Sequence, residues 1–143
     1  MAHVAKQLLD AVTAAVTGLP ATGERVQQSR TYVHQSGPAL NVRLGERRIL
    51  GIRGNAFVDV EQDIFIDIAV AGPAETIDDQ LLQIEAEVHR ALMANPALEL
   101  ACFLDVNPGG LSGPELELAE KPKAVATSHW RYQLRHTLAD PEH

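Results

Sequence analysis

The feature that most constrains this chain is a strict alternation of residue types between Val58 and Val70. The even-numbered positions are aliphatic except for Gln62, and four of the odd-numbered positions are acidic: Asp59, Glu61, Asp63 and Asp67. Because successive side chains of a strand point to opposite faces, this period of two predicts one long strand with an apolar face and a polar face. The Gly72-Pro73 pair is expected to end the strand.

Two other segments have the apolar spacing of amphipathic helices. The first covers residues 3–17 and precedes a helix-breaking Gly-Leu-Pro sequence. The second follows the long strand, and Thr76 with Asp79 is expected to form a capping-box-like pair at its start. Asn95-Pro96 is expected to end this helix. Its apolar stripe consists of Ile77, Leu81, Ile84, Val88 and Leu92.

Shorter alternating patterns predict the remaining strands. They cover residues 39–44, 98–106 and 124–138, with weaker candidates at 24–33 and 115–119. In the segment 98–106 the inward side chains are expected to be Leu98, Leu100, Cys102, Leu104 and Val106. In the last strand they are Ala124, Ala126, Trp130, Tyr132 and Leu134. We expect a hairpin tip or a mobile loop at the glycine-containing segment 45–55, a loop at 107–115 and a loose tail at 138–143.

The order helix, strands, helix, strands predicts an α+β fold. We expect a two-layer sandwich, in which a mostly antiparallel sheet of four or more strands has two α-helices packed on one face. The 143 residues suffice for one hydrophobic core and are read as a single domain, 1–143. The other face of the sheet, which carries the acidic row, is expected to be open or covered by another subunit.

The distribution of charge restricts the possible classes of function further. The net charge of −7 argues against a protein whose main task is to bind phosphate backbones. Residues 24–53 contain six arginines and two glutamates, whereas residues 54–120 contain fourteen acids and one base. Such an asymmetry favours head-to-tail self-association, although a solvated surface accounts for it equally well. The single cysteine and the absence of a run of ~20 apolar residues favour a soluble intracellular protein.

The residues that could carry catalysis or bind a metal have simpler interpretations. Ser112 lies among glycines that match neither a nucleophile elbow nor a phosphate-binding loop, so a turn is favoured. Glu85 and His89 are four residues apart on a predicted helix and lack a third metal ligand nearby in the sequence. Cys102 is expected to be a small buried side chain. The acidic row has no partnering histidine, so we expect no metal, no cofactor and no enzymatic activity.

Several segments, taken in order, match the pattern of a known family. They are the amphipathic N-terminal helix, Glu24-Arg25-Val26, Ser29-Arg30, Pro38-Ala-Leu-Asn-Val-Arg with Gly45-Glu46, the long alternating strand, the helix from Ile77, Asn95-Pro-Ala-Leu and the Trp130-Arg-Tyr132 strand. Over residues 3–138 this order resembles the tail terminator (minor tail protein U-like) family of long-tailed bacteriophages and prophages. The resemblance rests on order and spacing.

The resemblance implies a structural virion protein. Members assemble as a hexameric ring that caps the tail tube, stops its polymerisation and provides the head–tail joining surface. The implied partners are further copies of the chain, the tail tube protein and a head-completion or connector protein. DNA would pass through the lumen without specific binding, and neither a membrane nor a cofactor belongs to this role. The implied location is the tail–neck junction of the virion, after assembly in the host cytoplasm.

Two groups of residues are candidates for contacts in such a ring. Arg43, Arg47, Arg48 and Arg53 are expected at the interface with the next subunit or the tail tube, the last three on a loop. The acidic strand face of Asp59, Glu61, Asp63 and Asp67 is expected to face the lumen or the neighbouring subunit.

Three alternatives remain open on the sequence alone. One is another neck protein, such as a head-closure or tail-completion connector. Another is a cytosolic small-molecule-binding α+β domain that dimerises through its open sheet face and has a pocket between helices and sheet. The third is a minor hydrolase using Ser112 or Cys102, which would need an activating base that the sequence does not place.

Overall fold

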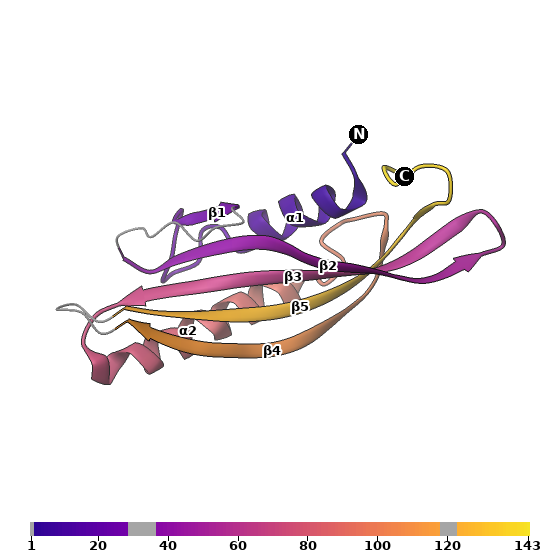
Figure 1. Cartoon of the computed structure of the whole chain (residues 1–143). Coiled ribbons are helices and arrows are strands. Elements are labelled where there is room, and N and C mark those ends of the chain that lie inside the picture. Colours follow the sequence, from indigo (N-terminus) through magenta and orange to yellow (C-terminus); the bar gives the residue numbers. More distant parts are fainter. Residues whose placement is uncertain (1, 29–36, 118–122) are drawn as a thin grey trace.

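The computed structural model describes residues 2–28, 37–117 and 123–143. In chain order the elements are α1 (Val4–Ala15), β1 (Val26–Gln28), β2 (Ala39–Arg53), β3 (Phe57–Ala71), α2 (Ala74–Ala94), β4 (Phe103–Glu117) and β5 (Lys123–Thr137). The strands form one sheet in the order β1-β2-β3-β5-β4 (Figure 1). Among the described strands only β1 and β2 pair in parallel. The predicted α+β sandwich, with a mostly antiparallel sheet, is confirmed.

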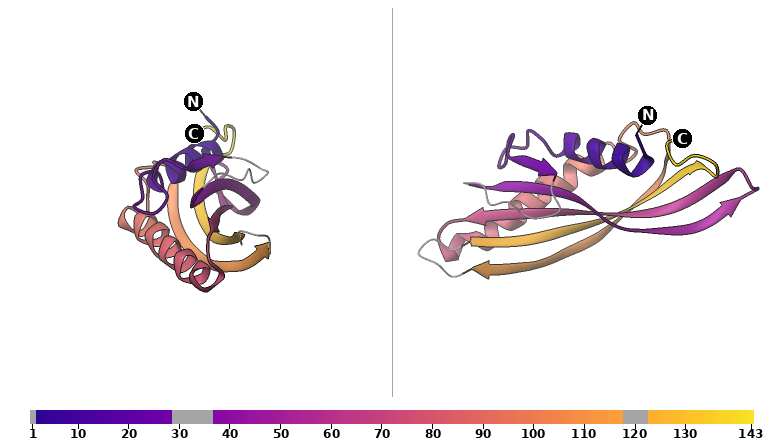
Figure 2. Two further views of the ribbon diagram at one scale, coloured as in Figure 1. Left: turned by 90° about the vertical axis from the view of Figure 1, so that its left-hand side faces the viewer. Right: turned by 45° about the horizontal axis from the view of Figure 1, so that its top comes forward.

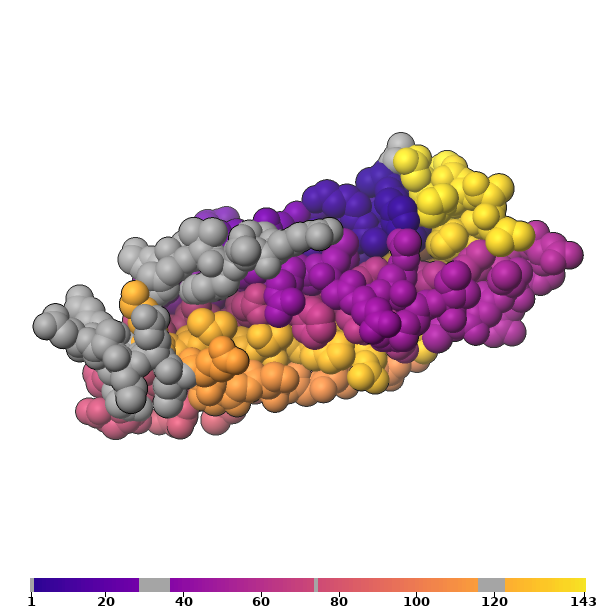
Figure 3. Space-filling view, viewed as in Figure 1, coloured from indigo at the N-terminus to yellow at the C-terminus, as the bar shows by residue number. Residues whose placement is uncertain are grey.

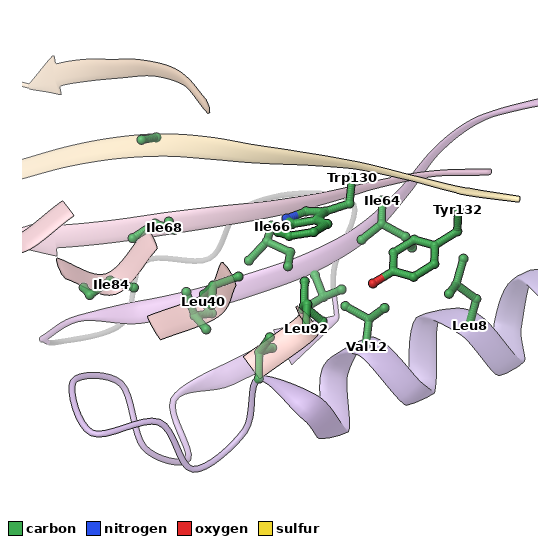
Figure 4. Close-up of a cluster of buried hydrophobic side chains, with 14 of the residues drawn as sticks. Leu8, Val12, Leu40, Ile64, Ile66, Ile68, Ile84, Leu92, Trp130 and Tyr132 are labelled. Atoms are coloured by element: carbon green, nitrogen blue, oxygen red, sulfur yellow. The ribbon is translucent and has the colours of Figure 1, made fainter. Parts of the chain in front are cut away.

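Both helices pack against the same face of the sheet, as expected (Figure 2). The even-numbered side chains of β3 point into this layer, and the whole predicted stripe of α2 is buried. In Figure 4, Trp130 and Tyr132 of β5 lie beside Ile64 and Ile66 of β3. Burial of these large side chains is the main stabilising contribution in a domain of this size. Neither helix in the described part of the chain is long and apolar enough to span a membrane.

Strand β2 is much longer than the predicted segment 39–44, so a mobile loop at 45–55 is wrong. The alternative, a hairpin tip, is correct only for the end of this segment. The strand continues to Arg53 and pairs with β3 along its length, with irregularities between Leu44 and Arg47 and between Ile49 and Gly51. These bulges insert unpaired residues and reverse the alternation, which hides the strand in the sequence pattern. The tight turn to β3 is confined to residues 54–56.

Strand β4 shows the same kind of difference. It begins at Phe103 and runs through the segment 107–115, which was expected to be a loop. Residues 96–102 form turns, so the predicted strand 98–106 is wrong for most of its length. A bulge between Phe103 and Asp105 changes the parity. As a result Phe103 packs against the core, and Leu104 remains 39% exposed.

Two glycines allow β2 and β4 to lie beside large rings. A side chain at Gly45 would overlap the ring of Phe65 on β3, and one at Gly109 would lie 2.9 Å from the ring of His129 on β5. The Phe65 and His129 rings contact each other, with centroids 4.7 Å apart. Covering a strand glycine with an aromatic ring compensates for the glycine's missing side chain.

The helix cap and the chain end also differ from expectation. Helix α2 starts after Pro73, and Thr76 lies within its first turn, where its hydroxyl donates to the Pro73 carbonyl rather than capping the helix. Residues 138–143 are not a loose tail: the Val4 amide donates to the Pro141 carbonyl at 2.9 Å, and Thr137 donates to His143. The C-terminal segment thus closes over the start of α1.

The weaker strand candidates are described only in part. Strand β1 covers three residues of the candidate 24–33, and residues 29–33 lie outside the described part. The candidate 115–119 continues β4 as far as Glu117, and residues 118–119 also lie outside it. The final strand is confirmed, with its five predicted inward side chains all buried.

The contact between Gly45 and Phe65 gives a prediction for stability. Gly45→Ala should lower the free energy of unfolding by about 1–3 kcal/mol, because the new methyl group must displace the ring. Chemical denaturation measures this change. Gly51→Ala is the matched control on the same strand, since a methyl group there meets no atom within 4 Å, and it should change stability by less than about 0.5 kcal/mol. Equal losses at both positions would contradict the described packing.

Candidate functional site

The predicted acidic residues lie on the sheet face opposite the helices, here called the outer face. They alternate along β3, the central strand of the sheet, so side chains from β2 and β5 flank them on both sides. Asp59, Asp63 and Asp67 are each only 5% exposed although no helix covers them. Buried carboxylates are costly unless they are paired, so their partners decide what this face can do.

Asp59 is bound by arginines from both neighbouring strands. Arg135 of β5 donates to its Oδ1 from Nε at 2.7 Å, and Arg53 of β2 donates to Oδ2 at 3.0 Å. The hydrogen bond from Arg135, with a further contribution from Arg53, lowers the pKa of Asp59 to about 2. This carboxylate is therefore charged at every physiological pH and is already occupied.

Glu61 and Asp63 share a single arginine. Nη2 of Arg48 lies 2.6 Å from Oε1 of Glu61 and 2.6 Å from Oδ1 of Asp63. Burial tends to raise the pKa of Asp63, but the hydrogen bonds from Arg48, with a contribution from the His129 ring whose Nε2 lies 3.4 Å from Oδ1, outweigh it and leave the pKa lowered. The Arg48 guanidinium thus joins two neighbouring carboxylates that would otherwise repel each other.

Asp67 accepts the largest set of hydrogen bonds. Arg43 donates to both of its oxygens, at 2.9 and 3.2 Å, and Asn41 and Thr127 also donate to it. Burial opposes ionisation, yet these donors keep the pKa of Asp67 below its usual value. The Arg43 guanidinium also lies over the Phe65 ring, 4.7 Å from its centroid.

These ion pairs join the two groups of candidate residues within one chain. Arg47, Arg48 and Arg53 lie on strand β2, so their expected place on a loop is wrong. Arg43, Arg48 and Arg53 bind the acidic row of the same chain. The four carboxylates of the acidic row are therefore all paired with arginines within one subunit, and the row is not a bare acidic wall. Arg47 differs: its side chain is exposed and its Nη1 lies 2.8 Å from Nε2 of His3, beside α1. Among the described side chains no carboxylate lies within ion-pair distance of Arg47.

The sequence interpretation missed an apolar surface at the end of β2. Residues 44–60, here called the distal hairpin, project at the end of the molecule where both termini lie (Figures 1 and 3). Its side chains include five large exposed apolar groups: Ile49 at 71%, Ile52 at 57%, Leu50 at 50%, Phe57 at 42% and Leu44 at 39%. Because the sequence pattern indicated a hairpin tip or a loop here, it did not assign these side chains to either face of the sheet. A cluster of exposed apolar side chains is typical of a protein interaction surface.

The other candidate residues are separated in space. Ser112 is exposed on β4 opposite Thr127, and Cys102 is half-buried in the turn before β4, where burial raises the pKa of its thiol. His89 lies against the ring of Trp130, with centroids 5.3 Å apart. Within residues 2–28, 37–117 and 123–143, no three His, Cys, Asp or Glu side chains are grouped to hold a metal ion.

The comparisons with known proteins leave the family open. No protein-family model matches the chain, and no curated protein matches it. The likeness to tail terminators is therefore carried forward as a proposal.

The pairing of Asp59 gives a prediction with a defined pH dependence. Its folded-state pKa, about 2, lies below the ordinary value of 3.8, so the pair stabilises the fold above about pH 4 and loses this effect as the pH falls toward 2. Asp59→Asn should lower the free energy of unfolding by about 1–2 kcal/mol at pH 7, with wild type and variant converging near pH 2.

Denaturant unfolding measured across this pH range tests the prediction. The control is Glu46→Gln, because Glu46 pairs with Arg48 through a side chain that is 70% exposed. That variant should change stability by less than about 0.5 kcal/mol. A constant difference between Asp59→Asn and wild type from pH 7 to pH 2 would contradict the assigned pairing.

Proposed function

We propose that this chain is the subunit of a phage-type tail terminator, a ring that caps a tail tube and joins it to the head. The observation that carries the proposal is the distal hairpin, whose exposed aliphatic side chains lie on an element that projects from the body. An isolated subunit gains nothing from exposing Ile49 and Ile52, whereas an assembling subunit buries such groups in its contacts.

The fold is compatible with this role. The resemblance implies a small α+β subunit, and the chain folds as one, with both helices on one side of a five-stranded sheet. In a ring, the outer face would present carboxylates that are already bound by arginines. A surface of balanced charge is suited to letting DNA pass without holding it.

One observation favours a second candidate, the small-molecule-binding domain. A hollow of about 430 Å³ lies at the end of the molecule, between the start of α1, the start of β4 and the C-terminal segment. Its size falls in the range of ligand sites. The layer between α2 and the sheet, in contrast, is filled by side chains such as Ile66 and Ile84, each at most 1% exposed. The expected pocket between helices and sheet is thus replaced by a hollow at one end.

The oligomeric state separates these two candidates. Native mass spectrometry over a range of concentrations should show hexamers at high concentration, without tetramers or octamers, because a closed ring has one preferred size. A stable dimer at every concentration would contradict the ring and favour the binding domain.

A capping assay tests the activity itself. Added to polymerising tube protein from the same genome, the chain should shorten the tubes and appear at one end of each. An unrelated acidic protein of similar size is the control and should leave tube length unchanged. Tubes of unaltered length in the presence of the chain would contradict the proposed function.

A further inference from the structure

We propose that neighbouring copies join through opposite edges of the sheet, the distal half of β2 in one copy docking on the first residues of β4 in the next. This inference rests on the proposed function, since it specifies how the ring is made. It commits to a second copy of the chain as the partner of the distal hairpin. The contact is heterologous: two different surfaces meet, as a closed ring requires.

The distal half of β2 is a free edge. Strand β1 pairs with β2 only from Leu40 to Val42, and beyond Val42 no described strand lies on that side of β2. The segment 43–53 contains no proline, so its outward amides remain available for pairing. Ile49 and Ile52 stand beside this edge, 71% and 57% exposed. Such an unprotected apolar edge is what another chain can extend.

The opposite edge, β4, is open over a short stretch only. Farther along the strand, Pro108, Pro114 and two of its three bulges protect the edge against pairing. The stretch 103–107 contains the third bulge, between Phe103 and Asp105, but it has no proline and carries the exposed Leu104 and Asp105. Each of the two edges thus offers one segment that is suited to contact. Both segments lie toward the same end of the molecule (Figure 1).

The register of the sheet places these two segments at the same level along the strand direction. Ile49 pairs with Val60, Val60 with Leu134, and Leu134 with Phe103. The next row runs from Arg48 on β2 to Asp105 on β4. A rotation that places copies side by side without a shift along the strands therefore brings residues 47–49 of one copy to residues 103–106 of the next. Residues 50–53 then extend past the first residue of β4, toward the turn that precedes it.

Charge favours this pairing over the contact of two β2 edges. Three of the four arginines of β2 are paired within the chain, which leaves Arg47 as its exposed positive charge, while β4 contains three acids and no basic residue. Two β2 edges would bring exposed Arg47 side chains together. The carboxylate of Asp105, which bonds only its neighbour's backbone amide among the described contacts, is instead available to an arginine. The 430 Å³ hollow beside Leu104 and Cys102 gives an aliphatic side chain of the hairpin a place to be buried.

Two variants test the contact by blocking one edge each. Ile49→Lys/Ile52→Lys blocks the β2 edge, and Leu104→Lys/Asp105→Lys blocks the β4 edge. All four side chains are exposed, so both variants should keep the wild-type free energy of unfolding. The control is Asp78→Lys/Leu82→Lys, which places two lysines at exposed positions of α2. Sedimentation velocity and native mass spectrometry give the oligomeric state.

The account predicts that each edge variant needs at least roughly tenfold more protein to assemble, while the control assembles like wild type. An equimolar mixture of the two edge variants should form one-to-one dimers that do not grow, because only one intact β2 edge and one intact β4 edge can meet. Edge variants that assemble like wild type, or a mixture that stays monomeric, would overturn the inference.

Failure of the inference can be told apart from failure of the proposed function. Wild-type protein that remains monomeric at every concentration overturns the edge contact, yet tube capping by that protein would still support a terminator. Rings that need both edges but leave tube length unchanged would support the edge contact and overturn the terminator.

Discussion

The structure depends on how the central strand, β3, keeps charged groups on one of its faces. Its even-numbered side chains fill the layer under the helices, which places Asp59, Asp63 and Asp67 in the middle of the opposite face. Carboxylates that lie so near to one another along one strand repel each other, and their burial removes hydration. Arginines from both flanking strands remove this cost, and because Arg43, Arg48 and Arg53 all come from β2, the same pairs hold that long strand in register with β3.

This internal pairing decides which surfaces are left for assembly. A charge asymmetry along the sequence suggested that one subunit's arginines would meet the next subunit's acids, but Arg43, Arg48 and Arg53 are paired with the acidic row of their own chain. What remains is an exposed arginine, Arg47, an apolar hairpin and a partly acidic opposite edge. The proposed ring contact therefore uses the edges of the sheet and leaves its paired face intact.

The sequence could predict the parts of the fold that follow one regular period. The stripe of α2, the alternation of β3 and that of β5 all gave the correct buried faces. It could not predict β2 and β4, because bulges change the parity of both strands and glycines there pack under Phe65 and His129, which are remote in sequence. The candidate site was named residue by residue, but its ion pairs join strands whose register no local pattern reveals. The apolar hairpin was missed for the same reason. Ile49 and Ile52 can be assigned to a face of the sheet only once β2 is known to continue to Arg53.

The central claim, that copies meet edge to edge, is tested most directly by amide hydrogen exchange in dilute and in assembled protein. Exchange reports backbone protection segment by segment. The account predicts that assembly slows exchange at residues 44–53 of β2 and 103–107 of β4 together, while α2 and the central strands keep the rates of the dilute protein. Protection that appears on α2, or on only one of the two edges, would contradict the account.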